Sequence, residues 1–195
     1  KKVLVIGAST GYGLASRITA AFGCHAATLG IMFEKPSNGK RTATPGWYNT
    51  AAFEEEAAKE GLYAKSINGD AFSKEVKEQA ISMIRQDLGK VDMVIYSLAA
   101  PRRTDAQGKT WVSSLKTTDK PFTEKSLDLR TNTIVTKTVE PAGEGELEGT
   151  VKVMGGEDWM DWIDALKEAD VLEKDAVTVA YSYIGPELTY PIYYD

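Results

Sequence analysis

The sequence predicts an α/β fold built around a doubly wound parallel sheet. Two observations support this prediction: apolar runs of strand length alternate with segments of helical periodicity, and a glycine-rich turn follows the first apolar run. The apolar run at residues 2–7 is typical of a strand that is buried on both faces, and we interpret residues 91–98 as another buried strand. Right-handed crossovers between these strands give the sheet order 3-2-1-4-5.

The predicted elements alternate along most of the chain. We expect residues 35–46, which are rich in Pro, Gly, Ser and Thr, to form a loop, and Ser73 to cap a helix. The first helix is expected to place Leu14, Ile18 and Phe22 on one face. We expect strands at residues 2–7, 26–33, 64–67, 91–98 and 176–183, and helices at residues 11–22, 47–60, 73–86 and 157–169.

The alternation lapses over residues 101–150. The β-branched pattern of Arg130–Thr138 predicts an antiparallel hairpin or short ribbon, and the acidic, Gly-rich Glu140–Gly149 predicts a loop. A structureless loop of about fifty residues is improbable in a compact domain. We therefore expect residues 101–150 to form a flap or β-ribbon, inserted after strand four in a single domain of residues 1–195.

Composition limits the function classes. The chain has 195 residues, 43% of them hydrophobic, and a net charge of −5, which disfavours nucleic-acid binding. Because the first residues show no charged segment followed by an apolar core, we do not expect them to be a signal peptide. No apolar run approaches the roughly 20 residues that a membrane span needs. The single cysteine, Cys24, is expected to be a small buried hydrophobe and favours a reducing compartment such as the cytoplasm. Because His25 is the only histidine, we expect no metal site.

Residues 7–13 (GASTGYG) carry the main chemical signal, directly after the first strand. Gly7 would permit a sharp turn, Gly11 a close approach of the backbone to a pyrophosphate, and Gly13 close packing of helix on strand. The helix N-terminus would bind the phosphates. This spacing is that of short-chain dehydrogenase/reductases, so we interpret it as a dinucleotide-binding loop of the Rossmann type; a tight structural turn is the alternative.

Glu34 follows the second strand, where a carboxylate can accept hydrogen bonds from a free ribose 2′-hydroxyl. It would repel a 2′-phosphate and so favours NADH over NADPH. Lys35, Lys40 and Arg41 argue the other way, because they could bind that phosphate. A solvated charge at the sheet edge is the alternative for Glu34.

Two further segments follow strands three and four. Asp70 is placed to bond the adenine amino group, although a helix N-cap is nearly as good an interpretation. The small residues of the segment 97–100 would let the backbone pass beside the cofactor ribose.

Tyrosine is concentrated near the C-terminus and offers candidate proton donors. A catalytic tyrosine, with an ordinary pKa of about 10, needs a nearby cation to work near neutrality. The Tyr-x-x-x-Lys motif of ordinary short-chain enzymes is absent, since Lys174 is the last lysine. The candidates are Tyr181, Tyr183, Tyr190, Tyr193 and Tyr194.

Several strings in one order resemble the bacterial trans-2-enoyl-CoA reductases and V-type enoyl-acyl carrier protein reductases. They are GASTGYGLASRI (7–18), TPGWYN (44–49), DAFS (70–73), YSLAAPRR (96–103), VMGGEDW (153–159) and AYSYIGP (180–186). The resemblance implies NADH-dependent reduction of the trans-2 double bond of an enoyl-CoA or enoyl-acyl carrier protein in fatty-acid synthesis. Hydride would reach the β-carbon, and a tyrosine would stabilise the enolate oxygen.

The resemblance also assigns residues. The phosphate loop falls on Gly7, Ala8, Ser9, Thr10, Gly11 and Tyr12; the ribose and adenine contacts on Phe33, Glu34, Asp70 and Ala71; the nicotinamide-side backbone on Leu98 and Ala99; the substrate-side tyrosine on Tyr183; and the catalytic tyrosine on Tyr193.

The sequence departs from the family pattern at its ends. The lysine that the family places nine residues after its tyrosine would lie past Asp195, and an N-terminal segment is absent. We therefore expect the sequence to be incomplete at both ends. The family resemblance implies a monomer. Two alternatives remain open, a non-catalytic NAD-binding module and a short-chain ketone or alcohol reductase.

Overall fold

The structure is a computed structural model that describes residues 1–182 and 187. The chain divides into two compact units, which are described separately. The first unit comprises residues 1–99, 104–109 and 158–181. The described part of the second unit comprises residues 100–103, 110–157, 182 and 187.

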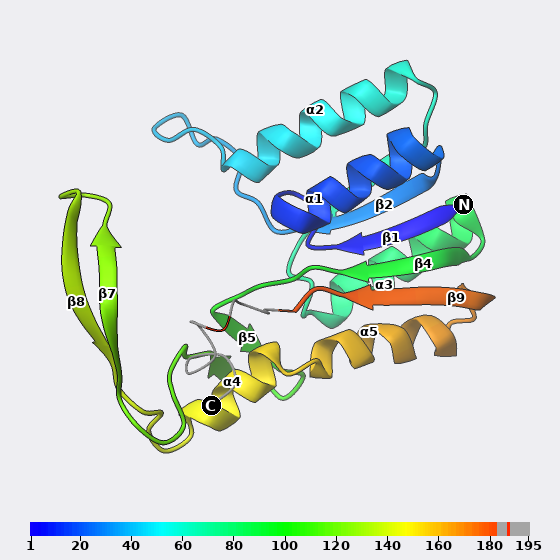
Figure 1. The fold of residues 1–195 in the computed structure, drawn as a ribbon. Helices are drawn as coiled ribbons and strands as arrows, with labels where there is room; N and C mark the ends of the chain where they lie inside the picture. The colour runs from blue at the N-terminus through cyan, green and yellow to red at the C-terminus, as the bar shows by residue number, and fades with distance from the viewer. Residues whose placement is uncertain (183–186, 188–195) are drawn as a thin grey trace. The chain divides into compact units, whose positions relative to one another are not determined.

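The first unit is built on a parallel sheet of five strands (Figure 1). Neighbouring strands are parallel throughout, and the order is β3-β2-β1-β4-β9. The predicted order 3-2-1-4-5 is therefore confirmed, with β9 as the fifth strand of the sheet. The strands are β1 (Lys2–Ile6), β2 (Ala27–Met32), β3 (Ala64–Asn68), β4 (Val91–Tyr96) and β9 (Leu172–Ala180).

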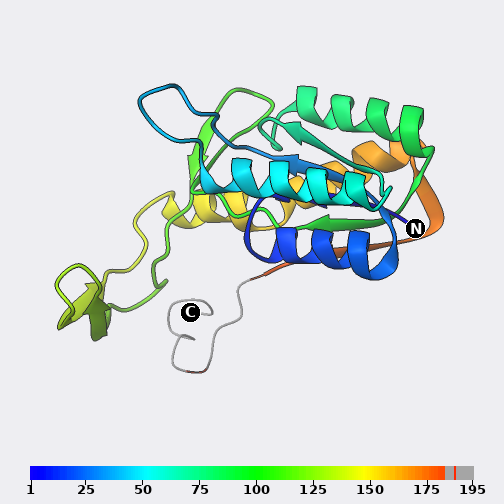
Figure 2. The same ribbon diagram turned by 90° about the horizontal axis from the view of Figure 1, so that it is seen from above.

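Helices cover both faces of this sheet. Helices α1 and α2 lie on one face, and α3 and α5 lie on the other (Figures 1 and 2). Alternate residues of β1 point to opposite faces: Leu4 and Ile6 pack in the cluster that contains Trp162 of α5, and Val3 and Val5 pack in the opposite cluster. The helices are α1 (Gly11–Ile18), α2 (Pro45–Lys59), α3 (Lys74–Met83) and α5 (Glu157–Glu168), with π-helical turns at Thr19–Gly23 and Ile84–Leu88.

The predicted buried face of α1 is wrong. The helix buries Gly13 and Arg17, and Ala21 continues this face in the π-helical turn that follows. Leu14 is only half-buried, and 43% of Ile18 is exposed. The helix lies so close to β1 that small side chains face the sheet. Arg17 fills the remaining space on this face, where its guanidinium group finds hydrogen-bond partners.

Other expectations also need correction. Cys24 is exposed, because it is the C-cap residue of the π-helical turn, at the surface where the chain reverses before it enters β2. Helix α2 begins at Pro45, inside the predicted loop, since proline suits the first helical position. Strand β9 begins at Leu172, four residues before the predicted start at Ala176, because Leu172 already pairs with Val91 of β4, and the register then shifts before Val177 pairs with Met93.

The described residues of the second unit form two pairs of strands and the helix α4. Strands β5 (Arg102–Thr104) and β6 (Thr110–Val112) form a two-stranded sheet. Strands β7 (Phe122–Asp128) and β8 (Thr133–Val139) form an antiparallel ribbon. Strand β8 overlaps the segment Arg130–Thr138 predicted to be a hairpin or short ribbon, and β7 lies before that segment. The loop predicted at Glu140–Gly149 is wrong from Glu146 onward, because α4 (Glu146–Met154) begins there.

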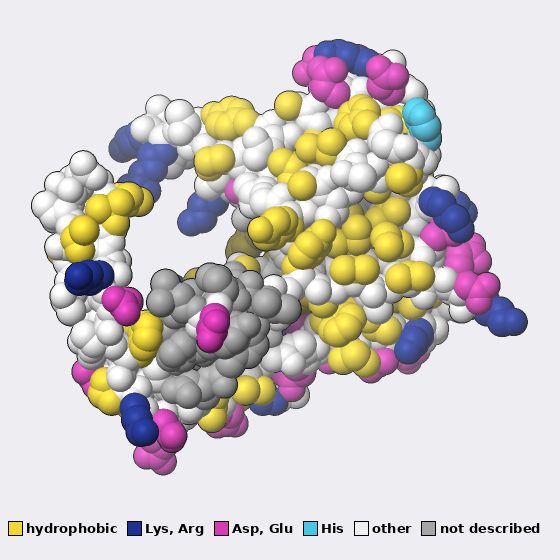
Figure 3. All heavy atoms as spheres, in the orientation of Figure 1, with side chains coloured by type: hydrophobic (Ala, Val, Ile, Leu, Met, Phe, Trp, Pro, Cys, Tyr) yellow, Lys and Arg dark blue, Asp and Glu magenta, His cyan; other side chains and the backbone are white. Residues whose placement is uncertain are grey.

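Apolar side chains gather on the face of the first unit that carries α1 and β9 (Figure 3). Val177 and Val179 of β9 are 54% and 40% exposed. None of the helices among the described residues has the length and apolar character of a membrane-spanning helix.

Candidate dinucleotide-binding site

The turn after β1 is fixed by backbone hydrogen bonds on both sides. The amides of Gly7 and Ala8 both donate to the Ile31 carbonyl of β2, each at 2.9 Å. The Ser97 amide donates to the Ile6 carbonyl at 2.8 Å, which joins the end of β4 to the end of β1. A Cβ atom on Gly13 would lie 2.0 Å from the Gly7 carbonyl oxygen. Only glycine at position 13 therefore lets α1 start this close to the strand end.

The N-terminus of α1 can receive an anion. Thr10 is the N-cap residue in an extended conformation, and within the described chain its side chain makes no capping hydrogen bond. No acidic residue lies in the first turn of α1. The amides of that turn therefore keep a partial positive charge and free donors, the arrangement that binds phosphate. The Asn49 side chain of α2 donates to the Ser9 carbonyl at 3.1 Å and holds the loop from the other side.

Glu34 is held in place at the end of β2. The Ser9 hydroxyl donates to Glu34 Oε1 at 2.6 Å. The Glu34 amide donates to Asn68 Oδ1 at 2.8 Å, and Asn68 Nδ2 donates back to the Glu34 carbonyl at 2.9 Å. A Cβ atom on Gly46 would lie 2.0 Å from Glu34 Oε1, so glycine there leaves space for the carboxylate. These contacts argue against a merely solvated edge charge.

Asp70 stabilises the turn after β3. Its Oδ1 accepts from the Phe72 amide at 3.0 Å, and its carbonyl accepts from the Ser73 amide at 2.9 Å. Ser73 is the N-cap of α3, because its hydroxyl accepts from the Val76 amide at 3.2 Å. The predicted cap at Ser73 is thus confirmed, and Asp70 remains half-buried at the sheet edge.

The remaining candidates lie near the same edge. Phe33 follows β2 and is 72% exposed, Leu98 is half-buried, and Ala99 is exposed. Tyr12 is 73% exposed, and its ring stacks on Tyr181 with centroids 5.4 Å apart. The structure thus brings every cofactor-binding candidate to the carboxyl ends of β1 to β4, the edge where ligands bind in this architecture.

Tyr181 completes this edge beyond β9. Its hydroxyl lies 2.7 Å from Ser16 Oγ, and its amide donates to the Tyr96 carbonyl at 2.9 Å. Tyr183 and Tyr193, the predicted substrate-side and catalytic tyrosines, lie outside the described residues. Within the described residues, no three His, Cys, Asp or Glu side chains form a group that could hold a metal ion.

The sequence did not indicate Arg17, which lies on the buried face of α1. Its guanidinium donates to Ser66 Oγ at 2.8 Å and to the Lys65 carbonyl at 2.7 Å, and it packs over the Phe53 ring. Burial lowers the pKa of Arg17 to about 10. The four-residue spacing of Gly13, Arg17 and Ala21 was the available signal, because it places them on one face of the helix.

Two family models match the chain. One, described as the NAD(P)H binding domain of trans-2-enoyl-CoA reductase, matches residues 1–39. The other, described as the trans-2-enoyl-CoA reductase catalytic region, matches residues 41–195. The chain belongs to the trans-2-enoyl-CoA reductase family. The resemblance stated from the sequence strings is therefore confirmed.

Relatives within the trans-2-enoyl-CoA reductase family match nearly the whole chain. The trans-2-enoyl-CoA reductase [NADH] of Ruminiclostridium cellulolyticum is 60% identical, and the enoyl-[acyl-carrier-protein] reductase [NADH] of Saccharophagus degradans is 62% identical. Each match covers 99% of this chain and 49% of the relative. The crystal structure of the Treponema denticola trans-2-enoyl-CoA reductase in complex with NAD matches with a TM-score of 0.96 and 52% identity, over 99% of this chain and 49% of that one. The chain thus spans about half the length of these relatives.

Proposed function

We propose that this chain binds NADH at the carboxyl edge of its parallel sheet. The observation that carries the proposal is the pairing of two groups. One is the helix N-terminus at Thr10, which has no side-chain cap among the described residues, and the other is the Glu34 carboxylate, held by Ser9. A helix N-terminus binds a pyrophosphate, and a carboxylate at the end of the second strand accepts from the adenosine ribose hydroxyls. The relatives named as NADH enzymes support the same cofactor.

The residues at this edge suit the parts of the cofactor. The loop from Gly7 to Tyr12 would hold the pyrophosphate, and Phe33 with Glu34 would hold the adenosine ribose. Asp70 and Ala71 would contact adenine, and the backbone of Leu98 and Ala99 would pass beside the nicotinamide ribose. A 2′-phosphate would meet the Glu34 carboxylate, which favours NADH over NADPH.

We propose that the protein containing this chain reduces the trans-2 double bond of an enoyl thioester. The acyl group is carried by coenzyme A or acyl carrier protein, the two carriers in the relatives' names. Bound NADH supplies a hydride. Tyr193 donates a hydrogen bond or proton to the thioester oxygen, where negative charge develops, and Tyr183 contacts the substrate. The family resemblance supports both tyrosine assignments.

The test uses the purified product of the complete open reading frame. NADH oxidation is followed with crotonyl-CoA, with the matching acyl carrier protein thioester, and with a panel of simple ketones. Oxidation that depends on an enoyl thioester supports the proposal, and the ratio of the two rates identifies the carrier. Oxidation by ketones alone would indicate a short-chain ketone reductase. Tight NADH binding without turnover would indicate a non-catalytic module.

We also propose a monomer located in the cytoplasm. The single cysteine is compatible with a reducing compartment. Sedimentation at several protein concentrations tests the oligomeric state, and a dimer at micromolar concentration would contradict it. Fractionation of the source cells tests the location.

A further inference from the structure

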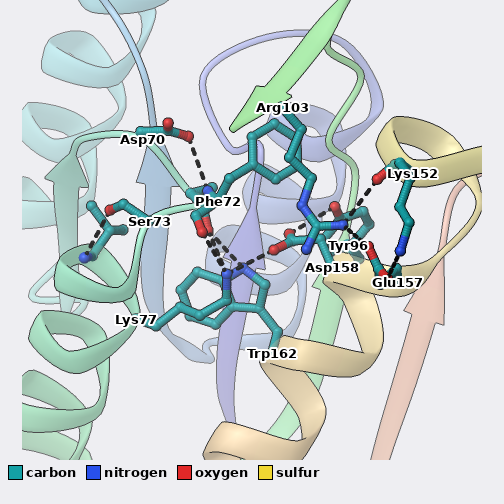
Figure 4. Close-up of polar contacts among 12 residues, drawn as sticks. Asp70, Phe72, Ser73, Lys77, Tyr96, Arg103, Lys152, Glu157, Asp158 and Trp162 are labelled. Carbon is teal, nitrogen blue, oxygen red and sulfur yellow. Dashed lines mark hydrogen bonds and ion pairs between the residues drawn. The ribbon is translucent and has the colours of Figure 1, made fainter. Parts of the chain in front are cut away.

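A buried polar network connects α3, α5 and the end of β4 in the first unit (Figure 4). Lys77 Nζ of α3 lies 2.7 Å from Asp158 Oδ1 of α5, and the Tyr96 hydroxyl donates to Asp158 Oδ2 at 2.9 Å. Lys77, Asp158 and Tyr96 are only 9%, 2% and 9% exposed. We refer to these three residues as the Lys77 network.

The Lys77 network also forms hydrogen bonds to the backbone of the turn that follows β3. Besides Asp158, Lys77 Nζ donates to the Ala71 and Phe72 carbonyls, each at 3.1 Å. An ammonium group has three donors, so these contacts use all of them. Trp162 Nε1 also donates to the Ala71 carbonyl at 3.1 Å. The backbone beside Asp70 is therefore fixed by side chains from α3 and α5.

The same network reaches the end of β4. Tyr96 is the last residue of that strand, and its carbonyl accepts from the Tyr181 amide. The segment from Ser97 to Ala99 begins at the next residue. One buried carboxylate, Asp158, thus links the turn proposed to contact adenine with the segment proposed to pass beside the nicotinamide ribose.

Stability alone does not explain such a network. The free energy needed to remove two charges from water is about as large as the free energy gained from their attraction. Apolar residues of similar volume are therefore often equally stabilising. What an ion pair with satisfied hydrogen bonds adds is a defined position for each partner. Here the partners that gain a defined position are two backbone carbonyls of the adenine-side turn.

We propose that Lys77, Asp158 and Tyr96 are positioning residues that set the spacing between the Asp70–Ala71 turn and the Leu98–Ala99 segment for the cofactor. The inference rests on the proposed NADH site. Without the network, the turn would occupy its binding position for only a fraction of the time. The apparent dissociation constant rises in inverse proportion to that fraction, so an occupancy of one tenth weakens binding about tenfold.

The test compares variants of the chain by NADH and ADP titration, thermal unfolding and hydrogen exchange. Asp158→Asn should lower the unfolding temperature and weaken NADH and ADP binding about tenfold. The double variant Lys77→Met/Asp158→Leu removes both charges, so its unfolding temperature should recover while ADP binding stays weak. Lys74→Met is the matched control, because Lys74 pairs with Glu78 on the exposed side of α3. Lys74→Met should change neither the unfolding temperature nor the affinities for NADH and ADP.

The outcomes separate this inference from the proposed function. If the double variant binds ADP and NADH as tightly as the unmodified chain, the network is only structural and the inference is overturned. If the unmodified chain binds no NADH, the proposed site is wrong. Hydrogen exchange then still tests the positioning role. Faster exchange in the double variant at the hydrogen-bonded amides of Phe72, Ser73 and Ser97 supports it, and unchanged exchange there overturns it.

Discussion

The Ser9 hydroxyl donates a 2.6 Å hydrogen bond to the Glu34 carboxylate, so the loop after β1 is tied to the end of β2. The two residues lie 25 positions apart in the sequence. Asn68, at the end of β3, fixes the backbone of Glu34 from the other side. The ends of three neighbouring strands, β1, β2 and β3, thus hold the Glu34 carboxylate at the place where a ribose is expected.

Replacing Glu34 by Ala should raise the use of NADPH relative to NADH. The substitution removes the charge that would repel a 2′-phosphate, and Lys35, Lys40 and Arg41 remain nearby in sequence. The measurement is the ratio of dissociation constants for NADPH and NADH. Glu60→Ala at the exposed C-cap of α2 is the control. An unchanged ratio in Glu34→Ala would remove Glu34 from the ribose site.

Replacing Gly13 by Ala should destabilise the chain and weaken NADH binding together. The added methyl group would meet the Gly7 carbonyl oxygen at 2.0 Å, so α1 must move away from the loop. We expect a cost of about 1–3 kcal/mol in the free energy of unfolding, measured by urea denaturation. Gly23→Ala is the control, because its methyl group would meet only Thr19 Cγ2 at 3.8 Å. Equal effects of the two substitutions would contradict the packing argument.

Replacing Arg17 by Met should lower the free energy of unfolding by about 1–3 kcal/mol, because Ser66 Oγ and the Lys65 carbonyl lose a charged donor. Arg17→Lys should not rescue it, since an ammonium group cannot reproduce the planar fork of the guanidinium or its stacking on Phe53. Arg130→Met, at a side chain that is 94% exposed, is the control. A fully stable Arg17→Lys would show that the fork geometry is unimportant.

Asp87 should make stability depend on pH in the acid range. The Lys65 ammonium and the Tyr63 hydroxyl, each 2.7 Å from Asp87 Oδ2, hold the pKa of this carboxyl below its ordinary 3.8. A lowered folded-state pKa contributes stability above pH 3.8, and this contribution is lost as the pH falls through the folded-state pKa. Asp87→Asn should therefore unfold at a lower temperature than the unmodified chain at pH 7.

The difference between the two proteins should shrink as the pH falls below 3.8. Thermal unfolding at a series of pH values measures it. Asp164→Asn, at an exposed position of α5, provides the comparison for a carboxylate outside this cluster. A difference that stays constant from pH 7 into the acid range would contradict the assignment.

Replacing Tyr193 by Phe, in the product of the complete open reading frame, should reduce turnover with little loss of NADH affinity. The change removes only the hydroxyl that would stabilise the developing negative charge, and a group that acts only in the transition state affects kcat. Steady-state rates with crotonyl-CoA and a separate NADH titration measure the two effects. Near-normal turnover would transfer the role to Tyr183 or another tyrosine.

The predictions from sequence succeeded where the signal was local. Apolar runs identified the five strands of the sheet, and the glycine spacing located the turn after β1. They failed where packing overrides periodicity. The apolar side chains of Leu14 and Ile18 suggested the wrong face for α1, because close approach to β1 favours Gly13 and Ala21. Glu146 was assigned to a loop because its neighbourhood is rich in Gly and Glu, yet α4 begins there.

The sequence by itself determined the order of strands, the glycine-rich turn after β1 and the family. The order follows from right-handed crossovers between alternating strands and helices, and the turn and the family follow from residue types at fixed spacings. Only the tertiary structure decided that Ser9 supports Glu34 and that Arg17 is buried. It also paired Lys77 with Asp158, 81 positions further along the chain. Ser9 and Glu34 meet because parallel strands bring their carboxyl ends to one edge, whereas Arg17 and Lys77 have close partners because a buried charge must find hydrogen-bond partners within reach.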